Sequence, residues 1–429
     1  MRPSHTQVLA VCSLIVLGVA VLDDALSPRT GLIVLPLTLL LPPGAACALM
    51  IAVAASPTQL QGEAVGPLSS VDVLVMGLIV RTALSPAFWK AGRPTLAMVT
   101  GVAAVVAGGL ATLGADNDSE VTASLRVGGY LSAALALSRT LRPGDLFTFA
   151  SGVLGVAIGQ ALAALAGLTP TGATGLPIGR YLGTLGDPNQ FGTPVAVALV
   201  MLVFSPGLIQ NRPLRLLTLA VLGLALFGSG TRSAWAGALI ALVAMGGWAL
   251  DRRESPSWAR FTSGFVLGAL VVVLCVSVVA GASALGLNPV STQIRAETVS
   301  AGWNYLAEHP FVPRGFGDFA TESGIYNTWL ALAVALTPIT ALWLALFAGL
   351  ATYAAWGQRL IALFPALLVI ATTTMTENVV QGGSALTLLW FVLLGCGAAV
   401  HAEARGAAAR RPDYATVSST DRKPKSRGR

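Results

Sequence analysis

The sequence predicts an all-α protein, a polytopic transmembrane helix bundle of about 12–14 helices with one folded extracytoplasmic loop that contains an amphipathic helix. Composition is the first reason. The 429 residues are 55% hydrophobic and 10% charged, and the mean hydropathy of +0.75 lies far outside the range of soluble globular domains. The second reason is that the apolar residues gather in segments of about 15 to 25 residues, which suits a hydrocarbon core roughly 30 Å thick.

We expect residues 1–400 to form one membrane domain. Pro36 and Pro42-Pro43 either kink the second apolar segment or split it into a short pair. No small-residue cleavage site follows the first segment, and Asp23-Asp24 comes next, so we expect a retained helix rather than a secretion signal. The predicted membrane helices lie at 8–22, 31–55, 68–84, 94–113, 121–141, 145–166, 188–205, 214–228, 232–250, 258–282, 326–350, 358–375 and 383–401.

The cysteines give no sign of a metal or redox centre. All four fall inside apolar segments and show neither metal-ligand nor disulfide spacing. We interpret them as small apolar packing residues and predict no metal and no cofactor.

The positive charge is concentrated in a tail at 401–429. This tail holds eight basic and three acidic residues, so it supplies +5 of the net charge of +7. We predict a disordered, basic, cytoplasmic tail that acts as a positive-inside topology anchor, and we expect no nucleic-acid partner.

A cytoplasmic tail assigns a side to every connection between the predicted helices. Five inner turns then each carry a basic residue, as the positive-inside rule requires: 85–93, 139–144, 206–215, 251–260 and 351–359. The outer connections are 56–67, 114–120, 167–187, 228–232, 283–325 and 376–382. The long 283–325 loop is therefore predicted to be extracytoplasmic.

Four arginines lie on the outer side against this bias: Arg180, Arg232, Arg295 and Arg314. They come from three outer segments that are far apart in the sequence. A charged residue near or inside a membrane costs roughly 2.5–3.5 kcal/mol on insertion scales, so such residues are usually functional or paired. The planar guanidinium binds phosphate oxygens through two donors at once, which indicates an anionic ligand on this face.

The first two arginines each lie close to the start of a predicted helix. After Arg180, Asp187 can cap a helix that has Pro188 at its first position and Asn189 next. Arg232 begins the second helix, beside glycines that allow a ligand close to the backbone. The alternatives are a capping turn with an incidental arginine, and an arginine that snorkels to the membrane interface.

The longest polar interval of the chain, Asn288 to Asn327, carries the other two arginines. Ser291 or Thr292 can cap a helix there, and His309-Pro310 ends it. The apolar stripe expected at helical spacing consists of Ala296, Val299, Trp303 and Leu306.

Arg295 shares a face of this predicted helix with Thr298, Gly302 and Tyr305, at the edge of the apolar stripe. The helix can therefore pack on the membrane bundle while it holds Arg295 toward a cavity. Glu297 and Glu308 are either solvated charges or partners of the outer arginines.

Four motifs follow one another in this part of the chain. They are GTLGDPNQFG at 183–192, SGTRSAW at 229–235, R-x7-W from Arg295 leading into EHPFVPRGFGDF at 308–319, and YNTWL at 326–330. In this order the region 180–350 resembles the O-antigen ligase and polysaccharide polymerase superfamily.

The resemblance implies a metal-independent membrane glycosyltransferase of cell-envelope polysaccharide biosynthesis, in the bacterial cytoplasmic (inner) membrane. Such an enzyme moves a glycan from an undecaprenyl-pyrophosphate carrier to a hydroxyl of a glycan, lipid or protein acceptor. Arg180, Arg232 and Arg295 match the basic positions that bind pyrophosphate, and the outer Arg314 is added to them. Asn327 matches the asparagine of the family's His-Asn-x-Tyr-Leu motif.

The chain departs from that motif at the position before Asn327. Tyr326 stands where the family has histidine, and a tyrosine with its ordinary pKa near 10 is a poor base at neutral pH. His309, Glu322 or Asp318 can take over that role if the fold brings them near. Alternatively, the leaving group needs little base assistance, or the protein is a catalytically silent homologue.

A different function class fits the same outer arginines. A transporter or flippase of an anionic solute would use them to attract its substrate without chemistry. Charges in the inner half of a pathway would favour transport, and the sequence has few: chiefly Arg81, with Arg126 toward the outer half. Glu377 and Asn378, in the last outer connection, either complete the arginine cavity or are simple turn residues.

Overall fold

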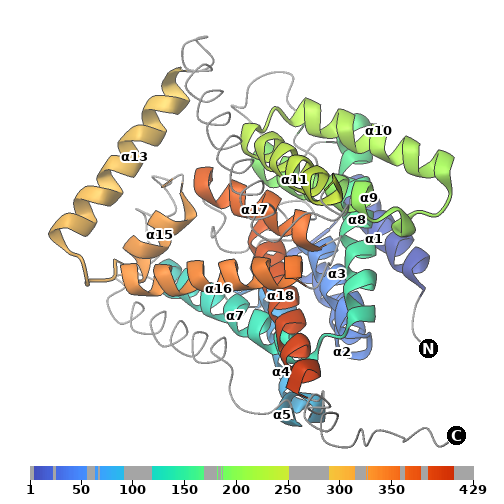
Figure 1. Cartoon of the computed structure of the whole chain (residues 1–429). Coiled ribbons are helices and arrows are strands. Elements are labelled where there is room, and N and C mark those ends of the chain that lie inside the picture. The colour runs from blue at the N-terminus through green and yellow to red at the C-terminus, as the bar shows by residue number, and fades with distance from the viewer. Residues whose placement is uncertain are drawn as a thin grey trace, which may run out of the picture.

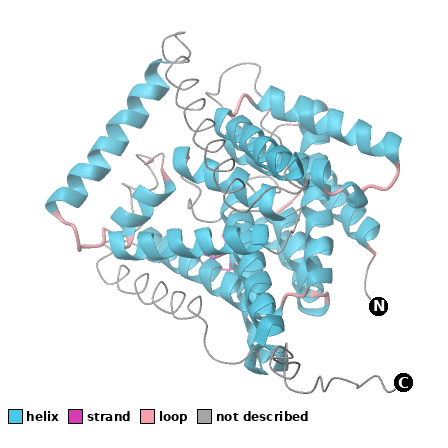
Figure 2. Cartoon of the chain, viewed as in Figure 1, coloured by secondary structure: helices cyan, strands magenta, loops and turns pink. Residues whose placement is uncertain are grey.

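The computed structural model of the chain is almost entirely α-helical in the part that it describes (Figure 2). The exception to helix and turn is a short antiparallel hairpin of β1 (Glu63–Val65) and β2 (Leu68–Ser69), in which Glu63 pairs with Ser69. The all-α part of the predicted fold class is confirmed. The described residues are 4–22, 26–55, 63–65, 68–90, 118–168, 181, 185, 187–250, 289–314, 325, 327–357, 363–377 and 385–409.

The N-terminal third begins with α1 (His5–Val21), which starts in a capping box between Ser4 and Gln7. The expected 31–55 helix is split, the second of the two predicted outcomes. A 3-10 helix, η2 (Pro28–Val34), leads into α2 (Leu35–Leu40), and α3 (Pro43–Ala54) follows. The break falls where prolines remove backbone donors and hold the preceding residue extended.

Three of the next helices follow the predicted segments closely: α4 (Ser70–Leu84), α7 (Asp118–Thr140) and α8 (Pro143–Leu165). The short α5 (Pro86–Lys90) lies in the stretch 85–93, which was predicted as a turn. The segments predicted at 94–113 and 258–282 lie outside the described residues.

Both helix starts predicted beside outer arginines are confirmed. Helix α9 (Pro188–Phe204) begins behind Asp187, whose side chain accepts from the Asn189 backbone N–H. A 3-10 turn, η5 (Pro206–Leu208), and α10 (Arg212–Ser229) follow, and α11 (Arg232–Leu250) starts at the predicted arginine.

The polar interval forms α13 (Pro289–Glu308), which ends just before His309-Pro310 as predicted. Its start is earlier than predicted, so Ser291 and Thr292 lie in the first turn and are not caps. The predicted apolar stripe is half wrong: Leu306 is buried and Val299 half-buried, but Ala296 is exposed and Trp303 is 61% exposed. The face that packs inward is instead the one that carries Arg295 and the buried Gly302.

The helix predicted at 326–350 is broken into α15 (Thr328–Ala335) and α16 (Pro338–Gly357). Pro338 cannot continue α15, and the Thr337 side chain accepts from the Thr340 backbone N–H to start the new helix. The chain ends in α17 (Leu363–Thr376) and α18 (Ala385–Ala409). Residues 401–409, which were predicted to belong to a disordered tail, are thus helical, and residues 410–429 lie outside the described residues.

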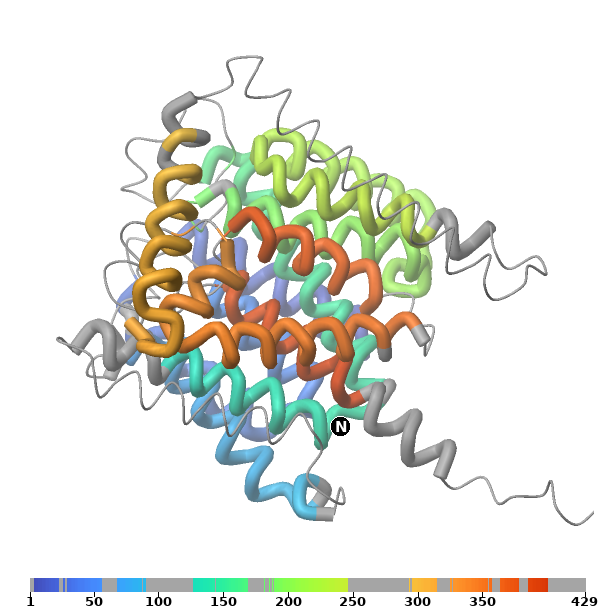
Figure 3. The backbone as a smooth tube through the Cα atoms, turned by 60° about the vertical axis from the view of Figure 1, so that its left-hand side comes forward, coloured from blue at the N-terminus to red at the C-terminus, as the bar shows by residue number. Residues whose placement is uncertain are grey.

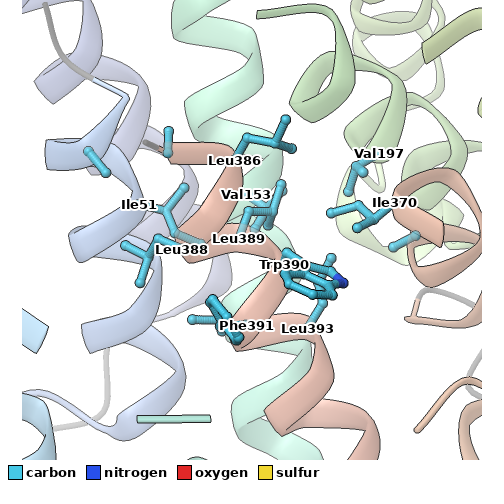
Figure 4. Close-up of a cluster of buried hydrophobic side chains, with 14 of the residues drawn as sticks. Ile51, Val153, Val197, Ile370, Leu386, Leu388, Leu389, Trp390, Phe391 and Leu393 are labelled. Carbon is cyan, nitrogen blue, oxygen red and sulfur yellow. The ribbon is translucent and has the colours of Figure 1, made fainter. Parts of the chain in front are cut away.

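Helix α18 forms the centre of the bundle. Its Leu389, Trp390 and Phe391 are buried, and Ile51 of α3, Val153 of α8, Val197 of α9 and Ile370 of α17 lie around it (Figure 4). Helices α9, α10 and α11 form one side of the molecule, whereas α13 lies at its periphery beside α15 (Figures 1 and 3).

Two stretches in the described part of the chain are long and apolar enough to cross a membrane, judged by length and composition. They are Gly144–Leu165, with 72% of its apolar window buried, and Arg212–Ser229, with 28% buried. The first resembles the core helix of a soluble protein as much as a membrane span. Other apolar helices, among them α9, α16 and α18, are shorter by the same measure.

Candidate functional site

A buried carboxylate at the end of α17 connects three other helices. Glu377 Oε1 lies 2.9 Å from Arg295 Nη2 of α13, and Oε2 accepts from Asn189 Nδ2 of α9 at 3.2 Å. The backbone oxygen of Glu377 accepts from Thr328 Oγ1, the first residue of α15, at 2.7 Å. We call Glu377 with Asn189, Arg295 and Thr328 the Glu377 cluster.

Arg295 binds the C-terminal end of α17 in two ways. Besides its ion pair with Glu377, its Nη1 donates to the Thr376 carbonyl at 3.3 Å. A cation at this end of a helix is favourable, because the last carbonyls carry partial negative charge and lack helical partners. The Arg295 side chain is 36% exposed and that of Glu377 is 9% exposed. The carboxylate is therefore almost entirely buried in this ion pair, whereas the arginine side chain stays partly exposed.

Asn189 reaches Glu377 because of how α9 starts. Asp187 Oδ1 accepts from the Asn189 backbone N–H at 2.8 Å, which fixes the first turn. The Asn189 side chain therefore does not cap the helix, and its amide donates to the Glu377 carboxylate. Asp187 thus supports the cluster through the backbone, without touching Glu377 in the contacts that the structure gives.

Asn327 caps α15 beside the cluster. Its Oδ1 accepts from the Leu330 backbone N–H at 3.0 Å, and its Nδ2 donates to the Met375 carbonyl at 3.0 Å. Both ends of the amide therefore hold α15 and α17 in place. In this structure Asn327 is a positioning residue.

Arg232 lies at the start of α11, directly after the buried Thr231. A Cβ atom at Gly192 would lie 2.8 Å from Thr231 Oγ1 and 2.9 Å from Ser229 Oγ, so the starts of α9 and α11 are in close contact. Gly192 is one helical turn beyond Asn189. The exposed Arg232 side chain accordingly extends from the neighbourhood of the Glu377 cluster.

Tyr181 packs on the turn before α11. Its backbone N–H donates to the Gly228 carbonyl at 2.8 Å, and its ring leaves no room for a Cβ atom at Gly228. The predicted pyrophosphate residue Arg180 lies outside the described residues, as do Glu322, Tyr326, Asp318 and Asn378.

A second group of predicted site residues lies at the other end of α13. The rings of Tyr305 and His309 stack with centroids 5.0 Å apart, and Arg314 Cζ lies 5.3 Å from the Tyr305 centroid. His309 and Arg314 are both exposed. Fourteen positions along a helix separate His309 from Arg295 by about 21 Å, so the structure does not bring His309 to the Glu377 cluster.

The acidic residues of α13 are exposed. Glu297 accepts from Gln293 Nε2 at 2.8 Å, and neither Glu297 nor Glu308 has an ion pair with an arginine among the contacts of the described residues. This arrangement fits solvated charges, one of the two interpretations of these residues.

Two buried hydroxyls lie near the starts of α9 and α11. Thr193 Oγ1 on α9 and Ser233 Oγ on α11 are buried and have no hydrogen-bond partner among the described residues. Hydroxyls can both donate and accept, so they suit the side of a polar site that faces the bundle.

Sequence reasoning named Glu377 without assigning it the central place, and it missed Thr328. One signal was available: Glu377 is the single acidic residue between Glu322 and Glu403, and it follows directly after a predicted apolar helix. An isolated carboxylate in that position needs a cation or hydrogen-bond donors, and the structure supplies both.

No group of three or more His, Cys, Asp or Glu side chains in the described part of the chain is placed to hold a metal ion. Comparison with models of known protein families and with curated protein sequences finds no match. The interpretation of the site therefore rests on its residues and their geometry.

Proposed function

We propose that the chain is a multi-pass protein of the bacterial cytoplasmic membrane that transfers or polymerises a glycan from an undecaprenyl-pyrophosphate-type lipid to an acceptor hydroxyl. The observation that carries the proposal is the convergence of Asn189, Arg295 and Asn327 beside Glu377. These residues come from three of the motifs that resemble the O-antigen ligase and polysaccharide polymerase superfamily, and they are far apart in the sequence. Arg232 adds a fourth motif next to them.

Exposed apolar helix faces support the membrane location. On α10, Leu217 is 61% exposed and Phe227 is 74% exposed, and α16 presents Leu342 at 61%. A soluble monomer rarely leaves large contiguous apolar surface in water, whereas a membrane protein turns such faces to lipid. Helix α10 is thus a lipid-facing helix in this proposal, with the C-terminal tail on the cytoplasmic side.

The charges around the cluster support an anionic ligand. Arg295 of α13 pairs with Glu377, and Arg232 begins α11, whose start contacts that of α9. The N-terminal ends of α9 and α15 lie beside Glu377 with their partial positive charge. Fixed cations and helix ends in a partly dry site stabilise negative charge that develops in a transition state. A departing lipid pyrophosphate develops such charge.

In the proposed reaction, the acceptor oxygen forms a bond to the anomeric carbon as the bond from that carbon to the phosphate oxygen breaks. The lipid pyrophosphate leaves with the bonding electrons, and Arg295 and Arg232 stabilise it. Tyr326 and Glu322 stay candidates to take the acceptor proton. His309 is the weaker candidate because it lies about 21 Å along α13 from Arg295.

The test is transfer from a lipid-pyrophosphate glycan donor by the purified full chain in lipid nanodiscs. We expect Arg295→Ala and Arg232→Ala to lower the transfer rate about 100-fold or more, as the loss of one group that stabilises the transition state typically does. Arg212→Ala, at the exposed start of α10, is the matched control and keeps its rate. Normal transfer by folded Arg295→Ala and Arg232→Ala proteins would defeat the assignment.

A transporter of an anionic solute is the second candidate, and one observation favours it. Arg126 Nε of α7 lies 2.8 Å from Asp72 Oδ2 at the start of α4, and the Asp72 side chain is 5% exposed. Buried ion pairs between membrane helices often mark substrate or ion pathways. Flux of a free anionic solute into proteoliposomes, with no glycan product and with loss of flux in Arg126→Ala, would favour this function.

A further inference from the structure

Glu377 places a negative charge where the proposed ligand needs a positive one. Its carboxylate accepts a hydrogen bond from Arg295. The proposed function assigns the same arginine to the diphosphate of the lipid-linked glycan. An arginine that is neutralised by a neighbouring carboxylate attracts an anion less than a free one does. This arrangement calls for a role beyond structural support.

The surroundings of Glu377 are those of an anion site. Asn189 Nδ2 donates to the carboxylate from the first turn of α9, and Thr328 at the start of α15 donates to its backbone oxygen. Helix N-termini and an arginine together form a natural position for negative charge. In the structure, Glu377 fills that position.

An incoming anion that displaces Glu377 has to reach Arg295 first, so Arg295 has to be the more exposed of the two side chains. Arg295 is 36% exposed in its side chain and Glu377 only 9%. A guanidinium has five N–H donors. A phosphate can therefore approach the exposed side of Arg295 while the Glu377 carboxylate is still bound. The diphosphate can then also accept the hydrogen bond that Arg295 Nη2 donates to Glu377, in the two-point geometry that arginine favours.

We propose that Glu377 is a displaceable counter-ion of Arg295, which the donor diphosphate replaces on the guanidinium and which returns to help expel the lipid pyrophosphate product. This inference rests on the proposed function. It concerns the same site and adds how the product, which keeps the diphosphate, is released. Glu377 takes no part in bond making, and its burial and two occupied oxygens fit that role better than proton transfer from a bulky acceptor.

The experiment compares Glu377→Gln with wild type in the full chain. Isothermal titration with inorganic pyrophosphate measures binding, and multiple- and single-turnover transfer measure the rates. We expect the Kd of Glu377→Gln for pyrophosphate to fall about tenfold, within the usual range of coupling between two ligands. Its steady-state rate falls because the product leaves slowly, while its single-turnover rate stays within about twofold of wild type.

Two further variants keep the test decisive. Glu377→Asp retains the charge but draws it back by one methylene group, so we expect it to tighten pyrophosphate by a smaller factor, about threefold. In an Arg295→Ala background, Glu377→Gln changes the pyrophosphate Kd less than about twofold, because the cation for which the carboxylate competes is gone.

The possible outcomes separate this inference from the function on which it rests. If wild type neither binds pyrophosphate nor transfers glycan, the proposed function fails and this inference with it. If wild type binds and Arg295→Ala binds more weakly, the site stands, and weaker binding by folded Glu377→Gln and Glu377→Asp overturns the counter-ion role alone. Intact binding with a single-turnover rate about 100-fold lower would make Glu377 a proton acceptor instead.

Discussion

The two ends of α13 carry arginines that look alike in the sequence and differ in their surroundings. Arg295, near the N-terminal end, forms an ion pair with the buried Glu377 of α17. Arg314, just past the C-terminal end, is exposed and lies over the ring of Tyr305. Sidedness and composition predicted one role for both, whereas the fold places only Arg295 in a buried network.

The difference shows that the contribution of an arginine to stability depends on the group with which it interacts. A charge that compensates a buried carboxylate cannot be removed without leaving that carboxylate uncompensated. A charge over an exposed ring contributes about 0.5–1 kcal/mol. The two ends of α13 are therefore expected to respond unequally to the same substitution.

The largest effect is expected from Arg295→Ala measured against Arg314→Ala. We expect Arg295→Ala to lower the free energy of unfolding by about 3 kcal/mol, at the low end for a broken buried pair because Arg295 is partly exposed. Arg314→Ala should lower it by less than about 1 kcal/mol. Chemical unfolding of the purified proteins in detergent measures both, and equal losses would remove the distinction between the two ends.

An intermediate effect is expected at Asn327, which joins α15 to α17 beside the first end. Asn327→Ala loses the cap of α15 and the bond to the Met375 carbonyl, so we expect a loss of about 1–2 kcal/mol. Asn327→Asp keeps the capping oxygen and loses only the donor, and it should lose less. If Asn327→Asp retains stability but loses transfer, Asn327 acts on the substrate and not only on the helix.

The smallest effect is expected at the second end. The Tyr305 hydroxyl donates to the Val312 carbonyl at 3.2 Å in an exposed setting. Tyr305→Phe removes that bond and keeps the ring under Arg314, so we expect a loss of about 0.5 kcal/mol and an unchanged transfer rate. A transfer defect with normal unfolding would show that the hydroxyl of the partly buried Tyr305 takes part in binding.

Local signals explain what the sequence could predict. Asp187-Pro188 fixes the start of α9, Arg232 the start of α11, and His309-Pro310 the end of α13, because caps and prolines act within one turn. The break at Pro338 was missed because the apolar character runs on through 326–350 and hides it.

The Glu377 cluster could be identified only from the fold. Glu377 meets Arg295 across 82 positions and Asn189 across 188 positions of the sequence, distances at which no spacing rule applies. The inward face of α13 was also beyond prediction, because a small residue, Gly302, contacts Leu330 and Ile325 while the large Trp303 stays outside. Hydrophobicity alone ranks these two residues the other way.

Helix α13 is fastened at three points. Arg295 holds α17, Gly302 lies against Leu330 and Ile325, and the Arg314 backbone N–H donates to the Val334 carbonyl of α15 at 3.0 Å. Two of the three points are on α15 or next to its start, and the contacts of Arg295 with Thr376 and Glu377 join the N-terminal half to the end of α17. Helix α13 lies beside α15 at the edge of the molecule (Figure 1). A ligand that displaces Glu377 from Arg295 would therefore release the N-terminal half of α13 from α17, while Gly302 and Arg314 still hold the chain to α15. The exchange of ions would in this way move one end of α13.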